Sequence, residues 1–241
     1  MMAKVAVIIP VRNEELNILK VIVDIQQHVM ETKPQVIVID DNCTDQTIAK
    51  LGVAELNNIG VGVLVGCTVG EHGFGYAIRK GFDMIRKLDF EYVVVVMGDC
   101  SDRVRDIDRM VKFMELHSNI GVVAPSRYMH GGKIIGKPFW QRLSSHSMCY
   151  LARVIFKVPL TDLTNAFKCY RMAAIKDLEL KSTGFDITPE ITLKVLSKGW
   201  RAAEFPTVWS KREHGHSKFR LLSQAKSYLY WLLWYSSTRL A

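Results

Sequence analysis

Acidic side chains stand at the ends of three short apolar runs in this sequence. In chain order they are Glu14, Glu15, Asp40, Asp41, Asp45, Asp99 and Asp102. Adjacent carboxylates repel one another, so a site that collects them requires a cation to offset their charge. A hard divalent ion that is bound by oxygen ligands and bridges to a diphosphate meets that requirement. The sequence therefore predicts a metal and phosphate site where these runs end.

Helix capping is a simpler use for some of the same residues. Thr44 and Asp45 precede a helix-like stretch, and both residue types accept hydrogen bonds from the free N–H groups at a helix N-terminus. Capping is thus the alternative for any one acidic cluster, whereas three clusters at three strand ends favour a binding site.

A glycine-containing loop, Glu71–Gly75, precedes another helix-like stretch. Gly73 and Gly75 permit a close approach of the backbone to a ligand, and a helix N-terminus favours phosphate. The loop is therefore a candidate for contact with a phosphorylated ligand, with a plain turn as the alternative.

Strand-like and helix-like segments alternate over the first half of the chain, and they must position these residues. The expected strands are Val5–Ile9, Val36–Ile39, Val61–Val65, Tyr92–Val96 and Gly121–Ala124. The expected helices are Leu16–Met30, Thr47–Leu56, Tyr76–Leu88 and Ile107–His117. Short apolar strands separated by helices indicate an α/β fold with a mostly parallel sheet covered on both faces. Ligands bind beyond the carboxyl ends of such strands, where the acidic clusters lie.

Composition limits the classes of function. The 241 residues are 49% apolar, which fits one large globular domain, alone or with a short appendage. The net charge of +8 favours polyanionic partners, but the basic residues form no recognisable nucleic-acid-binding module. The five cysteines include no CxxC pair, so a reducing cytosol is expected rather than a disulfide framework or a zinc site. No run reaches the about 20 apolar residues of a spanning helix.

Seven segments, taken in order, resemble the motifs of one known family. They are Val7–Ile18, Val36–Thr47, Gly73–Phe82, Ser126–Tyr128, Gly131–Gly132, Asp162–Phe167 and Arg212–Lys218. They extend over nearly the whole chain and are similar to family 2 glycosyltransferases, above all to the dolichol- or polyprenol-phosphate sugar transferases. The resemblance implies a GT-A fold over residues 1–218, a GDP- or UDP-linked sugar donor and Mg²⁺ or Mn²⁺. It also implies inverting transfer of the sugar to a polyprenyl phosphate.

The resemblance assigns individual residues to the metal and the donor. The family usually has Asp-x-Asp after the fourth strand; here Met97 takes the first position, and Asp99 keeps the second, which is the main metal ligand. Ser101 and Asp102 are the further candidate metal ligands. The expected contacts to the nucleotide sugar come from Pro10, Arg12, Asn13, Glu14, Asp40, Asp41, Gly73, Gly75 and Asp99. Loss of the first aspartate leaves a non-catalytic nucleotide-sugar-binding protein as an alternative.

A lipid phosphate is already an anionic nucleophile at neutral pH, so the protein has to position it and offset its charge. Arginine suits that task because its planar fork matches phosphate. The candidate acceptor-binding residues are Arg127, Arg142, Asp162, Asn165, Arg212 and Lys218, and the candidate catalytic residues are Asp99, Arg127, Arg212 and Lys218. A soluble or protein acceptor is the alternative.

The last segment, residues 219–241, is expected to form an amphipathic helix rich in tryptophan and tyrosine and flanked by basic residues. Trp and Tyr favour the lipid headgroup zone, and basic residues attract anionic lipid. A peripheral position on the cytoplasmic face of a membrane is therefore expected. Packing of this helix on the core, or on another subunit of a homo-oligomer, is the alternative.

Overall fold

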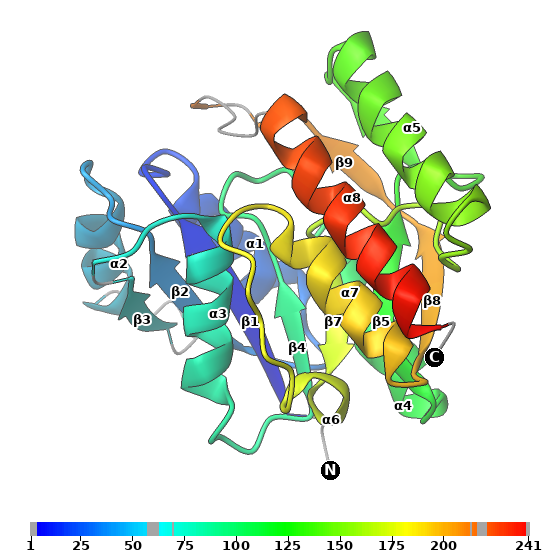
Figure 1. Ribbon diagram of the computed structural model, residues 1–241. Coiled ribbons are helices and arrows are strands. Elements are labelled where there is room, and N and C mark those ends of the chain that lie inside the picture. The colour runs from blue at the N-terminus through cyan, green and yellow to red at the C-terminus, as the bar shows by residue number, and fades with distance from the viewer. Residues whose placement is uncertain (1–3, 57–62, 69, 213, 216–220, 240–241) are drawn as a thin grey trace.

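The computed structural model describes residues 4–56, 63–68, 70–212, 214–215 and 221–239. In this part of the chain a seven-stranded sheet has the strand order β3-β2-β1-β4-β7-β5-β8 (Figure 1). Its strands are β1 Val5–Val11, β2 Gln35–Asp40, β3 Val63–Cys67, β4 Tyr92–Val95, β5 Ile120–Ser126, β7 Lys168–Arg171 and β8 Arg201–Pro206. A separate ribbon pairs β6 Lys133–Ile135 with β9 Val208–Ser210. The helices are α1 Ile18–His28, α2 Thr47–Leu56, α3 Phe74–Ile85, α4 Asp106–Leu116, α5 Phe139–Val154, α6 Met172–Ile175, α7 Ile187–Ser197 and α8 Leu221–Thr238.

The first half of the sheet, β3-β2-β1-β4, is parallel throughout, as the alternating pattern predicted. The side chains of β1 alternate between two apolar layers, one on each face of the sheet. Val7 and Ile9 lie in the layer that contains α1 and α4, whereas Ala6 and Ile8 lie in the layer that contains α3. Because both faces are covered, every position of β1 is buried and apolar.

β7 differs from the rest of the sheet because it lies antiparallel between β4 and β5. The sequence pattern predicted no strand there. The four residues of β7 begin with Lys168 and end with Arg171, so the segment lacks the apolar run that marks the other strands. It forms a strand because the gap between β4 and β5 supplies hydrogen-bonding partners on both sides, and this information is not local.

Three loops follow the carboxyl ends of β1, β2 and β4, which point the same way. Each loop contains one residue in the left-handed backbone region: Asn13 at φ 59°, Asn42 at φ 58° and Cys100 at φ 60°. Asparagine adopts this region more readily than most residues, and it allows the chain to turn tightly after the strand. The parallel strands thus bring the three acidic loops to one edge of the sheet, as predicted.

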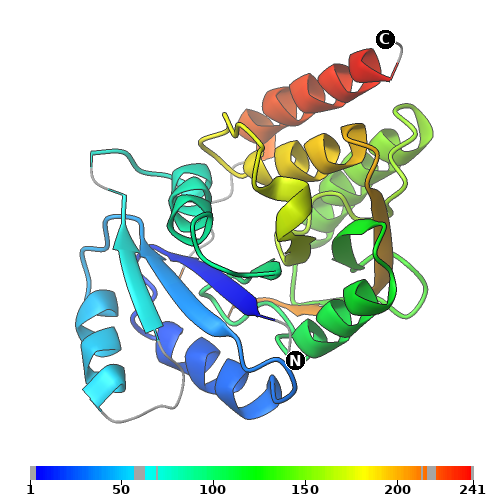
Figure 2. The same cartoon turned by 90° about the horizontal axis from the view of Figure 1, so that it is seen from below.

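The C-terminal segment forms α8, which packs against α7 and also contacts α5 (Figures 1 and 2). Trp231, Leu232 and Tyr235 are buried in the same apolar cluster as Leu193 of α7. One face of α8 therefore contacts the core. The expected domain boundary after residue 218 falls outside the described residues and stays a prediction. None of the helices in the described ranges combines the length and apolar character needed to cross a bilayer.

Candidate active site

One arginine joins two acidic loops at the carboxyl edge of the sheet. Arg212 donates from Nη1 to Glu14 Oε1 at 3.0 Å and from Nη2 to Asp99 Oδ2 at 2.5 Å. Asp99 is 5% exposed and Glu14 is 8% exposed. Burial is the main cause that raises the pKa of Glu14, and the charge of Asp99 adds to it. The two carboxylates therefore require a cation, and Arg212 supplies one.

Glu14 and Asp99 also have the donor chemistry of a divalent-ion site. The donor atoms are carboxylate oxygens, which Mg²⁺ and Mn²⁺ prefer. The Arg212 guanidinium, which contacts both carboxylates, shows that they attract a cation. Ser101 belongs to the same loop, and its N–H donates to Asp99 Oδ1 at 3.1 Å. Within the described residues there is no group of three or more His, Cys, Asp and Glu side chains that could hold a metal. An ion here would therefore take further ligands from water or a diphosphate, as Mg²⁺ commonly does.

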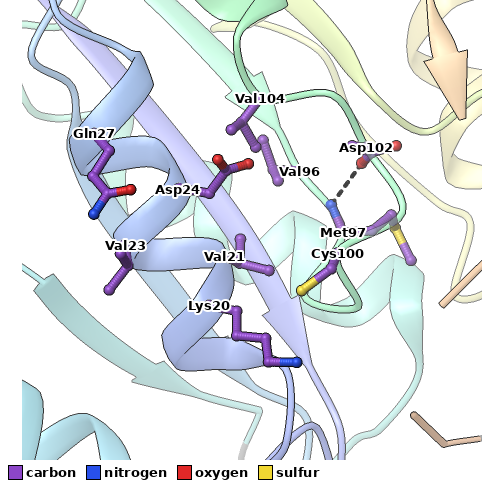
Figure 3. A pocket seen from close by; sticks show the side chains of 10 residues that line it. All are labelled: Lys20, Val21, Val23, Asp24, Gln27, Val96, Met97, Cys100, Asp102 and Val104. Carbon is purple, nitrogen blue, oxygen red and sulfur yellow. Dashed lines mark hydrogen bonds between the residues drawn. The ribbon is translucent and has the colours of Figure 1, made fainter. Parts of the chain in front are cut away.

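The side chain of Asp102, another candidate metal ligand, forms a hydrogen bond within its own loop. Its Oδ2 accepts the N–H of Met97 at 2.9 Å, and the carboxylate lines a cavity of about 380 Å³ between α1 and the end of β4 (Figure 3). Burial raises the pKa of Asp102 to about 7, and the charge of Asp99 adds to the shift. The hydrogen bond thus orders the loop at the position where the first aspartate of Asp-x-Asp is missing.

The loops after β1 and β2 hold each other in place. Glu14 N donates to Thr47 Oγ1 at 2.8 Å, and Thr44 N donates to Asn13 Oδ1 at 2.8 Å. Thr47 N donates to Asp45 Oδ1 at 2.9 Å, so the capping alternative is confirmed for Asp45. Asn13 is exposed and uses its side chain on Thr44, and its expected contact with the donor stays a prediction.

Asp41 joins the second acidic loop to the glycine loop. It is buried, and its Oδ1 accepts the N–H of Gly73 at 2.7 Å, while Arg12 Nη1 lies 3.9 Å from its Oδ2. Gly73 has φ 132°, which favours glycine. A Cβ at Gly75 would lie 2.5 Å from the carbonyl carbon of Thr183, so close packing requires this glycine. Both glycines thus have structural roles, and their contact with phosphate stays a prediction.

The remaining donor candidates are Pro10 and Asp40, and the remaining acceptor candidates are Arg142 and Lys218. Pro10 is buried within β1, and Asp40 Oδ1 accepts the N–H of Cys43 at 2.7 Å. Arg142 is exposed on α5, and its backbone N–H donates to Pro138 O at the start of the helix. Lys218 lies outside the described residues.

A second buried ion pair lies beyond the end of β5 and unites three of the acceptor candidates. Arg127 donates from Nε to Asp162 Oδ2 at 2.7 Å and from Nη2 to Asp162 Oδ1 at 2.8 Å. Asn165 N donates to Asp162 Oδ1 at 3.2 Å, and its Nδ2 donates to Pro125 O at 2.8 Å. Burial opposes the charge of Asp162, but the adjacent Arg127 outweighs it, so the pKa of Asp162 is lowered. The network is therefore ionised and largely buried.

Lys137 is a cation near this network that was not among the site residues predicted from the sequence. It is half-buried, with Nζ 3.5 Å from Ser145 Oγ and 5.5 Å from the centre of the Trp209 ring. Burial lowers the pKa of Lys137 to about 8, and the charge of Arg127 adds to the shift. The Asp162 carboxylate acts in the opposite direction and raises the pKa of Lys137, so it offsets part of this repulsion. No motif surrounds Lys137 in the sequence, so only its position in space reveals it.

Residues 6–179 match the family model described as glycosyl transferase family 2. The match includes the Glu14, Asp41 and Asp99 loops as well as both residues of the Arg127–Asp162 pair. The chain belongs to glycosyl transferase family 2. The resemblance seen in the sequence motifs is thereby confirmed for the larger part of the chain.

This family 2 glycosyl transferase has relatives named for lipid-linked sugars. It is 28% identical over 219 residues to the dolichol-phosphate mannosyltransferase of Pyrococcus furiosus, covering 90% of this chain and 59% of that protein. It is 27% identical over 220 residues to the polyprenol monophosphomannose synthase of Mycolicibacterium smegmatis, covering 88% and 79% respectively. The chain therefore spans less than two thirds of the length of the first of these relatives.

A solved structure shows the same fold as this family 2 glycosyl transferase. It is the glucosyl-3-phosphoglycerate synthase of Mycobacterium tuberculosis in complex with Mn²⁺, UDP and glucosyl-3-phosphoglycerate. The TM-score is 0.70 at 16% identity, over 98% of this chain and 80% of that one. The expected GT-A-like architecture is confirmed by this likeness.

The buried Arg127–Asp162 pair leads to a prediction about stability. Asp162→Asn should lower the free energy of unfolding by about 3–5 kcal/mol, because the Arg127 charge then stays buried without its partner. Urea unfolding followed by circular dichroism measures the change. The double variant Arg127→Met/Asp162→Leu is the control and should recover most of the loss, because neither charge remains. A loss below about 1 kcal/mol in Asp162→Asn, as for an exposed pair, would contradict the enclosed network.

Proposed function

We propose that this family 2 glycosyl transferase transfers a sugar from a nucleotide-diphosphate sugar to a polyprenyl phosphate, with inversion at the anomeric carbon. The observation that carries the proposal is the guanidinium of Arg212, which lies between two buried carboxylates, Glu14 and Asp99, beyond the ends of β1 and β4. Parallel sheets bind their ligands at this edge. The names of the two relatives, one for dolichol phosphate and one for polyprenol, support a lipid-phosphate acceptor.

Asp99, together with Glu14, would hold Mg²⁺ or Mn²⁺ in this proposal. When bound, the ion offsets the negative charge that develops on the departing nucleoside diphosphate. The structurally similar synthase was solved in complex with Mn²⁺ and UDP, which supports a divalent ion and a nucleoside diphosphate as ligands in this proposal. Arg212 lies at the same carboxylates and would share the charge of the diphosphate. Either UDP or GDP satisfies this arrangement.

The acceptor phosphate is proposed to lie near Arg127 and Lys137, beyond the end of β5. One of its oxygens attacks the anomeric carbon from the face opposite to the diphosphate. The bond from that carbon to the diphosphate breaks, and the electron pair leaves with the diphosphate. No proton has to be removed, because a phosphate monoester is already anionic at neutral pH. The protein therefore acts by positioning the two substrates and by offsetting charge.

A membrane surface supplies such an acceptor, so we place the enzyme peripherally on the cytoplasmic face of a membrane. The net charge of +8 supports contact with anionic lipid. Arg142 and Lys218 are proposed to contact the acceptor phosphate, and self-association into a homo-oligomer stays a prediction.

Binding of a nucleotide sugar without transfer is the second candidate function. The observation that favours it is Met97, which stands where the family has the first aspartate of Asp-x-Asp. Assays of sugar transfer to polyprenyl phosphate with Mg²⁺ and with Mn²⁺ separate the two candidates. Donor binding without turnover under both conditions would favour the second.

The role of Asp99 is tested by ligand binding and turnover together. Thermal unfolding with a panel of nucleoside diphosphates and Mn²⁺ should identify one that raises Tm, because a ligand that binds only the folded state stabilises it. Asp99→Asn should abolish the Mn²⁺-dependent part of this shift and lower kcat at least about 100-fold, with the fold unchanged. Asp83→Asn, an exposed carboxylate of α3, is the matched control. Wild-type turnover by Asp99→Asn would refute the metal site.

The contact between Arg212 and Asp99 predicts competition with the metal. Arg212→Met should bind Mn²⁺ alone more tightly, by about threefold or more, because no guanidinium then has to leave the carboxylates. The same variant should bind the nucleoside diphosphate more weakly, because a phosphate contact is lost. Isothermal titration calorimetry measures both affinities. Arg12→Met is the control, since Arg12 lies beside Asp41, and its Mn²⁺ affinity should equal that of the wild type. Unchanged Mn²⁺ affinity in Arg212→Met would show that the arginine and the ion occupy separate places.

Lys137 predicts a pH dependence for the use of the acceptor. Its folded-state pKa is about 8, lowered chiefly by burial. The lysine is therefore charged below about pH 8 and loses its charge as pH rises through that value. The kcat/KM for polyprenyl phosphate should accordingly fall above about pH 8. In Lys137→Met this limb should be absent and the KM for the acceptor raised at neutral pH, while donor affinity stays unchanged. An alkaline limb that persists in Lys137→Met would assign it to another group.

A further inference from the structure

Helix α5 buries its small side chains and exposes its large ones. The residues it buries are Ser145, Cys149 and Ala152. The large apolar residues that it exposes are Phe139 (70%), Trp140 (60%), Leu143 (52%), Tyr150 (64%) and Val154 (53%). At 3.6 residues per turn these five fall within about 100° of the helix circumference, so they form one continuous apolar face. An amphipathic helix that packs only on its own core shows the opposite arrangement.

The inner side of the same helix contacts the proposed acceptor site. Tyr128 OH and Ser145 Oγ are 2.5 Å apart. Further along the helix, Cys149 Sγ lies 3.8 Å from Asp162 Oδ1 of the buried ion pair. A contact made by the outer face of α5 is therefore one helix diameter away from the residues proposed to hold the acceptor phosphate.

The stretch of sequence that contains α5 carries basic residues and no acidic ones. No aspartate or glutamate occurs between Glu115 and Asp162. Basic residues of this stretch lie on α5 or beside its ends, at Lys137, Arg142, Arg153 and Lys157. At 100° per residue, Arg142 and Arg153 lie on one flank of the exposed apolar face. An apolar face with a basic flank complements the apolar interior and the negative surface of an anionic bilayer.

The neighbouring helix α8 contributes less to this surface. It exposes Leu229, Tyr230 and Leu233, but Trp231, one of its two tryptophans, is buried, with Nε1 donating to Ser182 Oγ at 2.9 Å. No acidic residue follows Glu213 in the sequence. Figure 1 shows α5 at the edge of the molecule beside α8, and the two helices are in contact. The exposed aromatic residues are therefore concentrated on α5 rather than on the C-terminal helix.

We infer that α5 is the helix that docks this protein on an anionic lipid bilayer, with its Phe139–Val154 face inserted at the headgroup level. The inference rests on the proposed function, because it identifies the surface from which the polyprenyl phosphate is taken. It assigns to α5 the interfacial role that the sequence suggested for residues 219–241. The lipid chain of the acceptor lies on the outer side of α5, and its phosphate is held on the inner side.

Two triple variants of the whole chain test this assignment. Phe139→Ser/Trp140→Ser/Tyr150→Ser removes the aromatic side chains of α5, and Leu229→Ser/Tyr230→Ser/Leu233→Ser removes the exposed apolar side chains of α8. Flotation with phosphatidylcholine vesicles that contain phosphatidylglycerol measures lipid binding. The α5 variant should bind at least about tenfold more weakly than the wild type, and the α8 variant should lose less than about threefold. Wild-type binding should also fall when salt is raised or phosphatidylglycerol is left out.

Activity assays keep this inference separate from the proposed function. Both variants change exposed side chains, so thermal unfolding and the affinity for nucleoside diphosphate should match the wild type. Transfer to a short, water-soluble isoprenyl phosphate should be unchanged in the α5 variant, whereas transfer to a long polyprenyl phosphate in vesicles should fall together with vesicle binding. If the wild type binds vesicles through α5 but transfers sugar to neither acceptor, the proposed function fails and the docking surface stands.

Three outcomes would overturn the docking surface itself. The first is a wild type that does not bind anionic vesicles, or an α5 variant that binds them as well as the wild type does. The second is a larger loss in the α8 variant than in the α5 variant, which would return the interfacial role to the C-terminal helix. The third is a wild-type dimer that the α5 substitutions dissociate in the absence of lipid, which would assign the face to a second copy of the chain.

Discussion

The enclosure of two carboxylates, Glu14 and Asp99, at the edge of a parallel sheet is the constraint on which the site depends. Like charges with little access to water are unfavourable unless a cation lies between them. Arg212 meets this need from a position 198 residues away from Glu14 in the sequence. It thereby ties the segment between β9 and α8 to the loops after β1 and β4. A divalent ion that binds these carboxylates as proposed would displace the Arg212 contact, so the charges that order the site would also respond to metal and nucleotide.

A second charged centre is built on the other half of the sheet, around Asp162. The loop that carries Asp162 is held from two sides: Glu204 of β8 accepts the Asp162 N–H at 3.0 Å, and Lys168 of β7 donates to Leu163 O at 2.7 Å. Burial lowers the pKa of Lys168 to about 7. The antiparallel strand β7 is what places this lysine in the interior, next to the Arg127–Asp162 pair. The part of the sheet around the antiparallel strand β7 thus positions the residues proposed to bind the acceptor. The parallel part, β3-β2-β1-β4, positions the residues proposed to bind the nucleotide-sugar donor.

Helix α5 connects this second centre to the outer surface. Its inner side contacts Tyr128 and Asp162, and its outer side presents the large apolar residues. A rigid helix of this kind fixes the distance between a surface at which a lipid is held and the place where its phosphate reacts. In the proposed function, the two charged centres and α5 would form one path, from the lipid surface through the acceptor site to the donor edge of the sheet.

The first half of the fold was predictable from the sequence because its information is local. Val36–Ile39 and Tyr92–Val96 are buried on both faces, so each reads as a short apolar run, and their parallel arrangement brings Asp41 and Asp99 to one edge. Tertiary structure alone decided that β7 is a strand, that Arg212 pairs with Glu14 and Asp99, and that Lys137 lies near Arg127. It also decided that α5 exposes its aromatic face, whereas α8 buries Trp231. These features depend on partners far apart in the sequence, and the packing and Coulomb interactions between such partners follow distance in space and leave no local pattern in residue order.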